Sequence, residues 1–261
     1  MLQGTSSRET RDAAREIKFL VTPAQAAQVL EWASARLAPD PYAGGPSGDE
    51  YQTTTLYFDT EDLAVFRRRG SYRRSKYRIR RYGSAEVAFL ERKLRTATLL
   101  SKRRTAVALD ELARVDEAVP DPTWAGHWFV QRLVARRLSP VCQVSYHRHA
   151  RVGTGAYGPL RLTFDNEILV QPCHGIHFEP TRGLPVLGSG TIIEMKYCVE
   201  IPGLLKELVE TFGLSPAAIS KYRLSMERLR EAGATTGVRR LDLRELLGTP
   251  GTAATARIVN A

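Results

Sequence analysis

The stretch TIIEMKY, residues 191–197, decides the fold class, because apolar and charged side chains alternate along it as they do along a β-strand. Side chains two positions apart share one face of a strand. Ile193 and Met195 therefore lie on one face, and Glu194 and Lys196 lie together on the other. A carboxylate and an ammonium ion thus share a face that is either solvated or lines a polar interior.

The same Glu-x-Lys triplet occurs in two other strand-like segments, REIKFLV (15–21) and AFLERKL (88–94). Further strand patterns cover residues 53–60, 75–83, 101–109, 141–153 and 160–170, and helical patterns cover 23–37, 61–69, 122–138, 203–213 and 215–230. Ser215 and Pro216 mark the start of the last helix, as an N-cap followed by proline does. Many strands, with helices between them and at the ends, predict an α+β fold whose antiparallel sheet closes on itself into a barrel.

The composition predicts one folded domain with two tails. The chain has 261 residues, of which 43% are hydrophobic and 25% charged, as in ordinary soluble proteins. We expect the domain to cover residues 15–230, with a disordered tail at 1–14 and a second tail at 231–261. There is no apolar run of 18 residues and no secretory signal pattern. Three scattered cysteines fit a reducing compartment, so a cytoplasmic location is expected.

The net charge points to an anionic ligand. Lys and Arg number 38 against 28 Asp and Glu, a net charge of +10. Such an excess is typical of proteins that bind nucleic acid, an anionic membrane or a phosphate-rich small molecule. The composition leaves these three classes open.

The charged residues of the predicted strands sort onto shared faces. Together with Lys221 of the last predicted helix, they amount to ten cations and three carboxylates, an excess of seven positive charges. The cations are Lys18, Arg78, Arg80, Lys93, Lys102, Arg104, Arg148, Arg161, Lys196 and Lys221, and the carboxylates are Glu16, Glu91 and Glu194. An enclosed face with this charge requires a dense anion, because desolvated like charges repel one another. A triphosphate or a longer phosphate chain, with a divalent metal ion held by a glutamate, fits such a face.

Two interpretations of this pattern remain open. For any one strand, an ordinary half-exposed sheet with apolar residues inside and charged residues outside explains the alternation. The recurrence of Arg and Lys on at least six strands favours a barrel whose apolar face packs outward under helices. In that arrangement the charged face lines a central cavity.

Seven motifs resemble, in order and spacing, the polyphosphate polymerase domain of the vacuolar transporter chaperone (VTC) family. They are KYRIRRYG (76–83), FLERK (89–93), SKRR (101–104), SYHRHA (145–150), LRLTFD (160–165), IIEMKY (192–197) and ISKY (219–222). That domain belongs to the triphosphate tunnel metalloenzymes, which are related to the CYTH phosphatases and cyclases. The resemblance implies an eight-stranded antiparallel tunnel and the synthesis of polyphosphate from ATP.

The resemblance also implies roles for individual residues. It assigns phosphoryl transfer to Lys18, Arg78, Arg80, Lys93, Arg148 and Lys221, and substrate binding to Lys102, Arg104, Tyr146, Arg161, Lys196 and Ser220. It makes Glu194 the ligand of Mn²⁺ or Mg²⁺, with Glu16 and Glu91 as further candidates. The expected partners are ATP and inorganic polyphosphate or phosphate, and no nucleic acid. A membrane-bound partner would have to be a separate chain, and the sequence indicates no oligomeric state.

One departure from the related hydrolases bears on the activity. In hydrolytic CYTH proteins the first strand resembles the motif ExExK. This chain has Ala14 at the first position of that motif and keeps only Glu16 and Lys18. Without that carboxylate a second metal ion or an activated water is harder to hold, which favours the polymerase. The alternatives are a metal-dependent triphosphatase or polyphosphatase, and a non-catalytic protein that binds polyphosphate or nucleic acid.

Several other motifs are weaker. GTGAYG (153–158) matches a dinucleotide-binding pattern, but the strand that follows it predicts a hairpin loop. CHGIH (173–177) has no second ligand pair at zinc-finger spacing. His147 and His149 alternate with Arg148 and are expected to point away from the charged face. The basic stretch 66–83 supports nucleic-acid binding or phosphate binding equally well.

Overall fold

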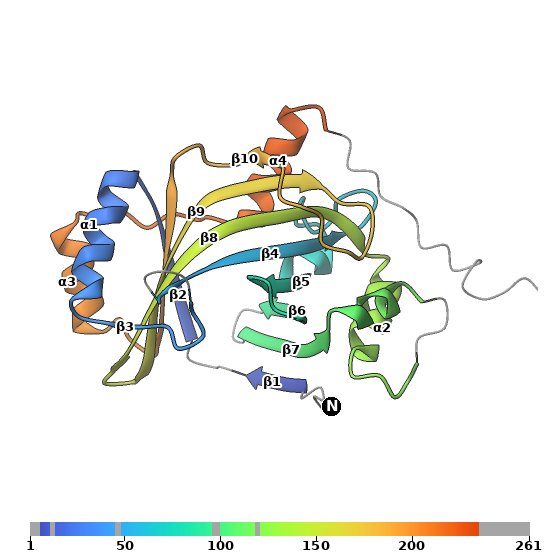
Figure 1. The fold of residues 1–261 in the computed structure, drawn as a ribbon, viewed down its shortest axis with the longest axis horizontal. Coiled ribbons are helices and arrows are strands. Elements are labelled where there is room, and N and C mark those ends of the chain that lie inside the picture. Colours follow the sequence, from blue (N-terminus) through green and yellow to red (C-terminus); the bar gives the residue numbers. More distant parts are fainter. Residues whose placement is uncertain (1–5, 11–13, 45–47, 96–99, 118–120, 235–261) are drawn as a thin grey trace, which may run out of the picture.

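The fold is one large antiparallel sheet with helices packed around it (Figure 1). The structure is a computed structural model that describes residues 6–10, 14–44, 48–95, 100–117 and 121–234. Its strands are β1 (Ser6–Thr10), β2 (Ala14–Val21), β3 (Ala38–Pro39), β4 (Glu50–Asp59), β5 (Ser75–Tyr82), β6 (Val87–Arg95), β7 (Leu100–Ala108), β8 (Ser139–Gly155), β9 (Gly158–Pro172), β10 (Leu184–Pro185) and β11 (Thr191–Cys198). The α-helices are α1 (Pro23–Ser34), α2 (His127–Arg136), α3 (Gly203–Thr211) and α4 (Lys221–Glu231), and two 3-10 helices cover Gly70–Arg74 and Asp110–Asp116.

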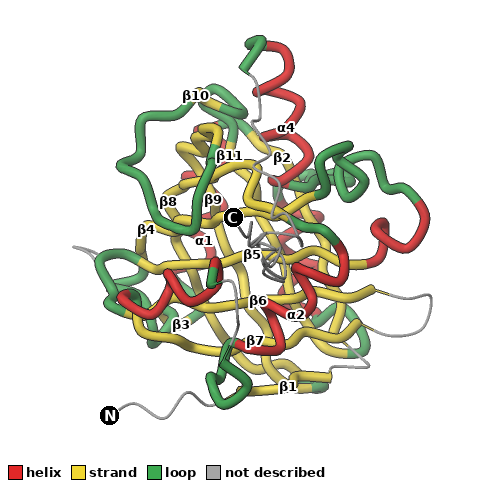
Figure 2. Tube along the Cα trace, turned by 90° about the vertical axis from the view of Figure 1, so that its right-hand side faces the viewer, coloured by secondary structure: helices red, strands yellow, loops and turns green. Residues whose placement is uncertain are grey.

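The strand order runs β1-β7-β6-β5-β4-β8-β9-β11-β2, with the short strands β3 and β10 paired at the side. Figure 2 shows β5, β6, β7 and β1 following one another down the lower part of the molecule. Eight of these strands are eight or more residues long, which agrees with the number predicted. The α+β class is confirmed. Among the described residues, no strand pairing joins the two ends of the sheet into a closed barrel.

Apolar side chains cover the outer face of the sheet and pack under the helices. Helices α1 and α3 lie together at one end (Figure 1) and cover β2, β9 and β11 through a cluster that includes Phe19, Leu162 and Met195. Helix α2 lies at the other end, where Phe129 packs edge-on against Phe58 of β4. Each such side chain contributes about 1.5–3 kcal/mol when it is fully buried. The apolar face of the strands therefore points outward, which leaves the charged face on the inside.

Three details differ from the sequence prediction. Residues 6–10 form β1, paired with β7, although residues 1–14 were expected to be disordered. Residues 61–69 form turns instead of a helix, because the carboxylate of Asp59 accepts hydrogen bonds from the backbone N–H groups of Val65 and Phe66. The last helix begins at Lys221 instead of Pro216, since Ser220 is its N-cap.

Parts of the predicted tails fall outside the described residues, namely 1–5, 11–13 and 235–261. The predicted hairpin at 153–158 is confirmed, because β8 and β9 pair directly on either side of it. Within the described ranges, none of the helices combines the length and apolar character needed to cross a bilayer.

Candidate functional site: the concave charged face

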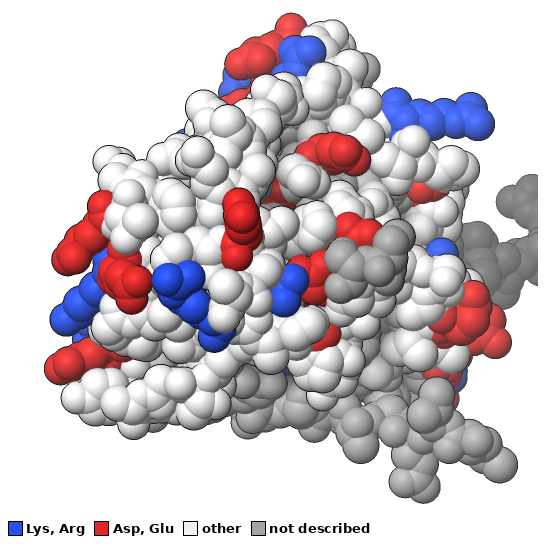
Figure 3. Space-filling model, turned by 60° about the vertical axis from the view of Figure 1, so that its left-hand side comes forward, with Lys and Arg blue, Asp and Glu red and all other residues white. Residues whose placement is uncertain are grey.

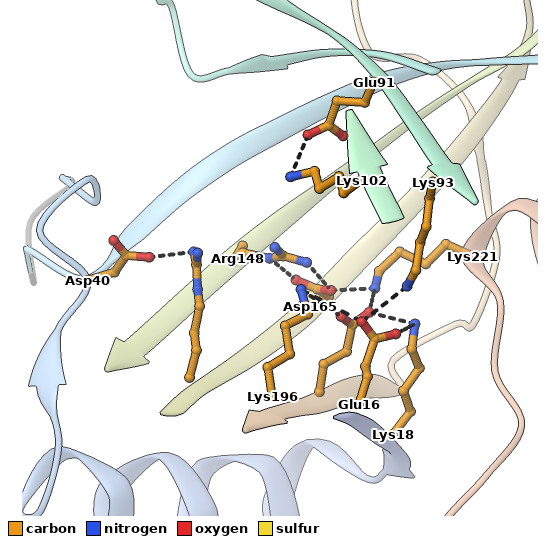
Figure 4. Close-up of polar contacts among 12 residues, drawn as sticks. Glu16, Lys18, Asp40, Glu91, Lys93, Lys102, Arg148, Asp165, Lys196 and Lys221 are labelled. Carbon is orange, nitrogen blue, oxygen red and sulfur yellow. Dashed lines mark hydrogen bonds and ion pairs between the residues drawn. The ribbon is translucent and has the colours of Figure 1, made fainter. Parts of the chain in front are cut away.

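The sheet curls so strongly that side chains from distant strands meet across its inner face. Five strands separate β6 from β2 along the sheet. Even so, the ammonium nitrogen of Lys93 on β6 lies 3.4 Å from a carboxylate oxygen of Glu16 on β2. A flat or gently twisted sheet would hold these residues far apart. We call this inner surface the concave face, and Figure 4 shows several of the predicted site residues on it, among them Lys18, Lys102 and Lys196.

Glu194 of β11 lies at the centre of the concave face. One of its carboxylate oxygens, Oε1, is 2.9 Å from the ammonium nitrogens of both Lys18 and Lys221. Its backbone is directly paired with that of Lys18 on β2, so the alternation of both strands brings the two side chains together. Burial alone would raise the pKa of Glu194, but Lys221 and Lys18 hold this pKa well below its usual range. Glu194 is therefore an anion that lies between two cations.

Asp165 of β9 forms a second anionic centre beside Glu194. It is fully buried and accepts two parallel hydrogen bonds from the guanidinium of Arg148, at 2.5 and 2.7 Å. Lys221 also contacts Asp165 and thereby joins the two carboxylates. Burial acts to raise the pKa of Asp165, yet Arg148 and Lys221 keep it below its ordinary value. This paired geometry fixes the Arg148 side chain more firmly than a single hydrogen bond would.

Helix α4 positions Lys221 at this junction. Ser220 caps the helix by accepting a hydrogen bond from the backbone N–H of Arg223. The hydroxyl of Tyr222 donates to the carboxylate of Asp59 at the end of β4, which fixes the first turn of the helix to the sheet. Lys221 is consequently buried and directed onto the concave face. Asp165 and Glu194 raise its pKa despite the opposing effect of burial.

Glu91 of β6 forms a separate centre farther along the concave face (Figure 4). Its carboxylate lies 2.6 Å from Nε of Arg78, 3.0 Å from Nζ of Lys102 and 3.4 Å from Nε of Arg104. Although burial opposes it, Arg78 and Arg80 hold the pKa of Glu91 well below its usual range. Three of the predicted cations thus surround one buried anion.

Glu16 connects the cluster around Glu194 with a cation of a further strand, Lys93 of β6. Its carboxylate lies 3.2 Å from Lys18, 3.4 Å from Lys93 and 3.8 Å from Lys196. Burial and Glu194 act to raise its pKa, but Lys18, Lys93 and Lys196 lower it to about 2. Glu16 is therefore ionised at any physiological pH.

Arg80 and Arg161 lie on the same face with different partners. Nε of Arg80 donates to the hydroxyl of Thr55 at 3.2 Å, and no carboxylate of the described residues lies within ion-pair distance of it. Arg161 donates to the hydroxyl of Tyr51 at 2.7 Å and pairs with the buried Asp40. Arg80 is thus a buried cation that forms no ion pair in the described part of the protein and acts on Glu91 only over a longer distance.

Three buried hydroxyls on the concave face have no hydrogen-bond partner among the described residues. They belong to Thr53 of β4, Tyr146 of β8 and Thr163 of β9. The Tyr146 ring lies 5.1 Å from Nζ of Lys221 and 5.2 Å from the guanidinium carbon of Arg148. An unsatisfied buried hydroxyl costs about 1–3 kcal/mol, which a ligand with acceptor oxygens would recover. The donors and cations together fit an anion rich in oxygen atoms.

Three charged residues of this face, Asp40, Asp165 and Lys76, were not predicted. Asp165 continues the alternation of Arg161 and Thr163 along β9, and Lys76 continues that of Arg78 and Arg80 along β5. Extending each alternation by one more step would have found these two. Asp40 lies after β3, outside any such alternation, and pairs with Arg161.

Lys76 is a partly buried cation of this face. Its ammonium group donates to the hydroxyl of Ser220 at 2.8 Å. Burial, together with Lys18 and Lys93, lowers the pKa of Lys76 to about 8. Burial also lowers the pKa of Lys196 to about 8, with part of the effect cancelled by Glu194. Water reaches 43% of the Lys196 side chain and screens its interactions with neighbouring charges.

The carboxylates of the concave face suit a hard cation only in part. Glu194 and Glu16 offer oxygen donors close together, whereas Glu91 has its own cations and lies apart. In the described part of the protein, these carboxylates do not form a group of three converging ligands. Mg²⁺ and Mn²⁺ commonly bind through one or two carboxylates and take their remaining ligands from phosphate oxygens and water. The residues present fit a metal ion of that kind.

The outside of the molecule differs from the concave face. Figure 3 shows acidic and basic side chains mixed over the face that comes forward, without one continuous basic surface. The arginines of the basic stretch, Arg67, Arg68, Arg69, Arg73 and Arg74, are exposed. Cations therefore occur outside as well, but those on the concave face come from many strands and meet around shared carboxylates.

Comparison with known proteins identifies the family. The VTC domain matches residues 13–230 of the chain. The chain belongs to the VTC domain family. This match confirms the resemblance seen in the seven motifs. No curated protein sequence matches the chain.

Solved structures show where else this fold occurs. A candidate adenylate cyclase from Bacillus halodurans is 17% identical, with a TM-score of 0.53, over 82% of this chain and 95% of that chain. The candidate adenylyl cyclase HpAC1 from Hippeastrum, for which a dominant triphosphatase activity is described, is 16% identical, with a TM-score of 0.46, over 87% and 99% of the two chains. A candidate adenylate cyclase from Vibrio parahaemolyticus is 12% identical, with a TM-score of 0.44, over 82% and 98%. The likeness to the Bacillus protein shows that the VTC domain shares its fold with cyclase-like proteins. Family and fold together indicate chemistry on a triphosphate or polyphosphate.

Proposed function

We propose that the sheet of this VTC domain encloses a tunnel along the concave face and that the protein synthesises inorganic polyphosphate there. The end of a phosphate chain attacks the γ-phosphorus of ATP. A new P–O–P bond forms, the bond between the γ-phosphorus and the β–γ bridging oxygen breaks, and ADP leaves. The observation that carries this proposal is the contact of Lys93 on β6 with Glu16 on β2, since it brings charged side chains of distant strands face to face.

The arrangement supports phosphoryl transfer because this reaction needs alignment and charge neutralisation more than covalent chemistry from the protein. Arginines can bind two phosphate oxygens at once, and Arg148 is held rigid by Asp165 for that task. The ammonium groups of Lys18 and Lys221 lie 2.9 Å from Glu194 and can exchange this carboxylate for phosphate oxygens. The attacking phosphate oxygen is already anionic, so no protein group has to act as a base.

The family resemblance suggests roles for individual residues, and their positions on the concave face support these roles. We propose Lys18, Arg78, Arg80, Lys93, Arg148 and Lys221 as the groups around the transferred phosphoryl, and Lys102, Arg104, Tyr146, Arg161, Lys196 and Ser220 as further substrate contacts. Glu194, with Glu16 beside it, would hold Mg²⁺ or Mn²⁺, which when bound neutralises charge on the phosphate oxygens. Asp165 and Lys76 join the site through Arg148 and Ser220.

The proposal is tested by incubating the purified protein with ATP and either Mn²⁺ or Mg²⁺. We expect ADP and long polyphosphate, resolved by thin-layer chromatography and on a gel. Orthophosphate as the only phosphate product would show a triphosphatase instead. Binding of polyphosphate or of oligonucleotides without turnover of ATP would show a binding protein, and oligonucleotide binding should then weaken steeply with salt.

Arg80→Met is expected to weaken binding of tripolyphosphate and to stabilise the free protein. Arg80 forms no ion pair in the described part of the protein, and the nearby Glu91 is already paired with three other cations. The free state therefore retains a weakly compensated buried charge that the anion would neutralise. A hydrogen bond to a charged group contributes about 1.5–3 kcal/mol, which corresponds to a dissociation constant about 10- to 100-fold higher. Calorimetric titration measures the affinity, and thermal unfolding without ligand measures the stability.

Arg132→Met is the matched control for this prediction, because Arg132 is an exposed arginine of α2 on the outside of the sheet. It should leave both quantities unchanged. Equal tripolyphosphate affinity in Arg80→Met and the wild type would remove Arg80 from the binding site.

Binding of tripolyphosphate near pH 8 is expected to take up protons. The pKa values of Lys76 and Lys196 are about 8 in the free protein, so each lysine is half protonated at that pH. A bound polyanion raises both pKa values, so the complex binds up to about one proton more, and affinity falls as the pH rises above 8. Calorimetry in two buffers of different ionisation enthalpy measures this uptake.

Comparing variants distinguishes protons taken up by the lysines from protons taken up by the ligand itself. Lys76→Met should lose about half a proton of uptake, because that group no longer titrates. Lys206→Met, which removes an exposed lysine of α3, should behave like the wild type. The same uptake in all three proteins would contradict the assignment of Lys76 to the binding site.

A further inference from the structure

A second group of ligating side chains lies on the outer face of the sheet, away from the concave face. His147 and His149 of β8 flank Arg148, and successive side chains of a strand point to opposite faces. Glu50 of β4 is the backbone partner of His149, and it lies diagonally opposite His147. These three residues are the one group of three metal-ligating side chains that converges in the described part of the protein.

The distances within this group are those of a metal site. Oε2 of Glu50 lies 3.6 Å from Nε2 of His147 and 3.5 Å from Nε2 of His149. Two ligand atoms that are each about 2.0–2.1 Å from a tetrahedral Zn²⁺ ion lie about 3.3–3.5 Å apart. All three ligand atoms lie within 4.8 Å of one another. An ion could therefore enter between them with only small rotations of the side chains.

A buried carboxylate supports one of the histidines from behind. Nδ1 of His149 lies 3.4 Å from Oδ1 of Asp49, whose other oxygen is held by Arg151 at 2.6 Å. Asp49 is only 2% exposed, so its position is fixed. A carboxylate on Nδ1 keeps the proton there and leaves the lone pair of Nε2 for a metal ion, as in carboxylate–histidine–zinc arrangements. The direction of this contact agrees with Nε2 as the ligand atom.

We propose that Glu50, His147 and His149 bind a divalent transition-metal ion of the zinc class. Two imidazoles and one carboxylate suit zinc better than magnesium or calcium, which prefer oxygen ligands. The side chains of His147, His149 and Glu50 are 30%, 19% and 18% exposed, so an ion can enter from solvent and water can take the fourth position. The ion would link Glu50 of β4 to the two histidines of β8 that flank Arg148. This site does not depend on the activity proposed for the concave face.

The experiment titrates the full-length apoprotein with Co²⁺ as a spectroscopic substitute and with Zn²⁺ in a competition assay. Wild-type protein should bind one Co²⁺ with the intense visible absorption of a four- or five-coordinate nitrogen-ligated ion. An ion held only by carboxylates of the concave face would be six-coordinate and absorb weakly. His147→Gln and His149→Gln should each weaken this binding by about 100-fold or more, and Asp49→Asn by about 10-fold. Circular dichroism confirms that each variant is folded.

Two controls make the result decisive. His177 lies beside the carboxylate of Glu179 but has no third ligand there, so His177→Gln should bind Co²⁺ like the wild type. Glu194→Gln should also keep the intense absorption, since it alters only the concave face. Zn²⁺ should raise the unfolding temperature of the wild type and not that of His147→Gln. Equal Co²⁺ affinity in the wild type, His147→Gln and His149→Gln, or loss of the intense absorption in Glu194→Gln alone, would overturn the proposal.

Discussion

Glu194→Gln is expected to lower the rate of polyphosphate synthesis by about 1,000-fold, because a metal ion or cation network at the transferred phosphoryl contributes several kcal/mol. The same substitution removes one negative charge from a face that already carries excess positive charge. Binding of tripolyphosphate should therefore stay equal or become tighter. Product analysis measures the rate, and calorimetric titration measures the affinity. Loss of turnover together with retained binding is the combination that a merely structural role would not produce.

The stability of Glu194→Gln also has a predicted sign. Lys18 and Lys221 lose their shared partner, so the free protein should unfold at a lower temperature. Tripolyphosphate should restore part of that loss, because it supplies new anionic partners. Glu207→Gln, on the exposed surface of α3, serves as the matched control and should leave rate and stability unchanged. Wild-type rates in Glu194→Gln would exclude this glutamate from the reaction.

Arg148→Met is expected to lower the free energy of unfolding by about 3 kcal/mol, the lower end of the range for a buried ion pair that loses one partner. The lower end applies because Asp165, which is fully buried, keeps its contact with Lys221. Denaturant unfolding at neutral pH measures the change. The double variant with Asp165→Asn should lose less free energy of unfolding than the sum of the losses in the two single variants, because both substitutions remove the same ion pair.

A surface ion pair provides the comparison for Arg148. Arg223 on α4 pairs with Glu227 at 3.5 Å, and both side chains are more than a third exposed. Arg223→Met should cost about 0.5 kcal/mol or less. An effect of Arg148→Met as small as this would mean that Asp165 is hydrated, and the rigid placement of Arg148 would lose its support.

The two buried arginines illustrate how position decides the effect of one residue type. Arg148 forms two hydrogen bonds to the carboxylate of Asp165, so its loss removes a cationic partner from a buried anion. Arg80 donates to a neutral hydroxyl, so its loss removes a charge that forms no ion pair among the described residues. The first substitution should destabilise the free protein and the second should stabilise it. Only the contacts distinguish them, since both residues fit the same strand alternation.

Much of the concave face could be predicted because strand alternation is a local property. The charged side chains of β2, β5, β6, β7, β9 and β11 lie on the face that their i, i+2 spacing indicated, and Ser220 and Tyr146 lie beside them. Asp165 and Lys76 escaped notice although the same spacing includes them. The predicted start of α4 was wrong, because Ser215 and Pro216 resemble a helix start as closely as Ser220 does.

The sequence by itself determined the α+β class, the division of each strand into an apolar and a charged face, and the family. These depend on the order of residues within short segments, where the geometry of a strand is always the same. Only the tertiary structure decided which cation meets which carboxylate, that Lys221 joins Glu194 to Asp165, and that His147 and His149 converge on Glu50. Those contacts depend on the curl of the sheet and on the register between strands. Both are determined by the packing of side chains that are distant in the chain.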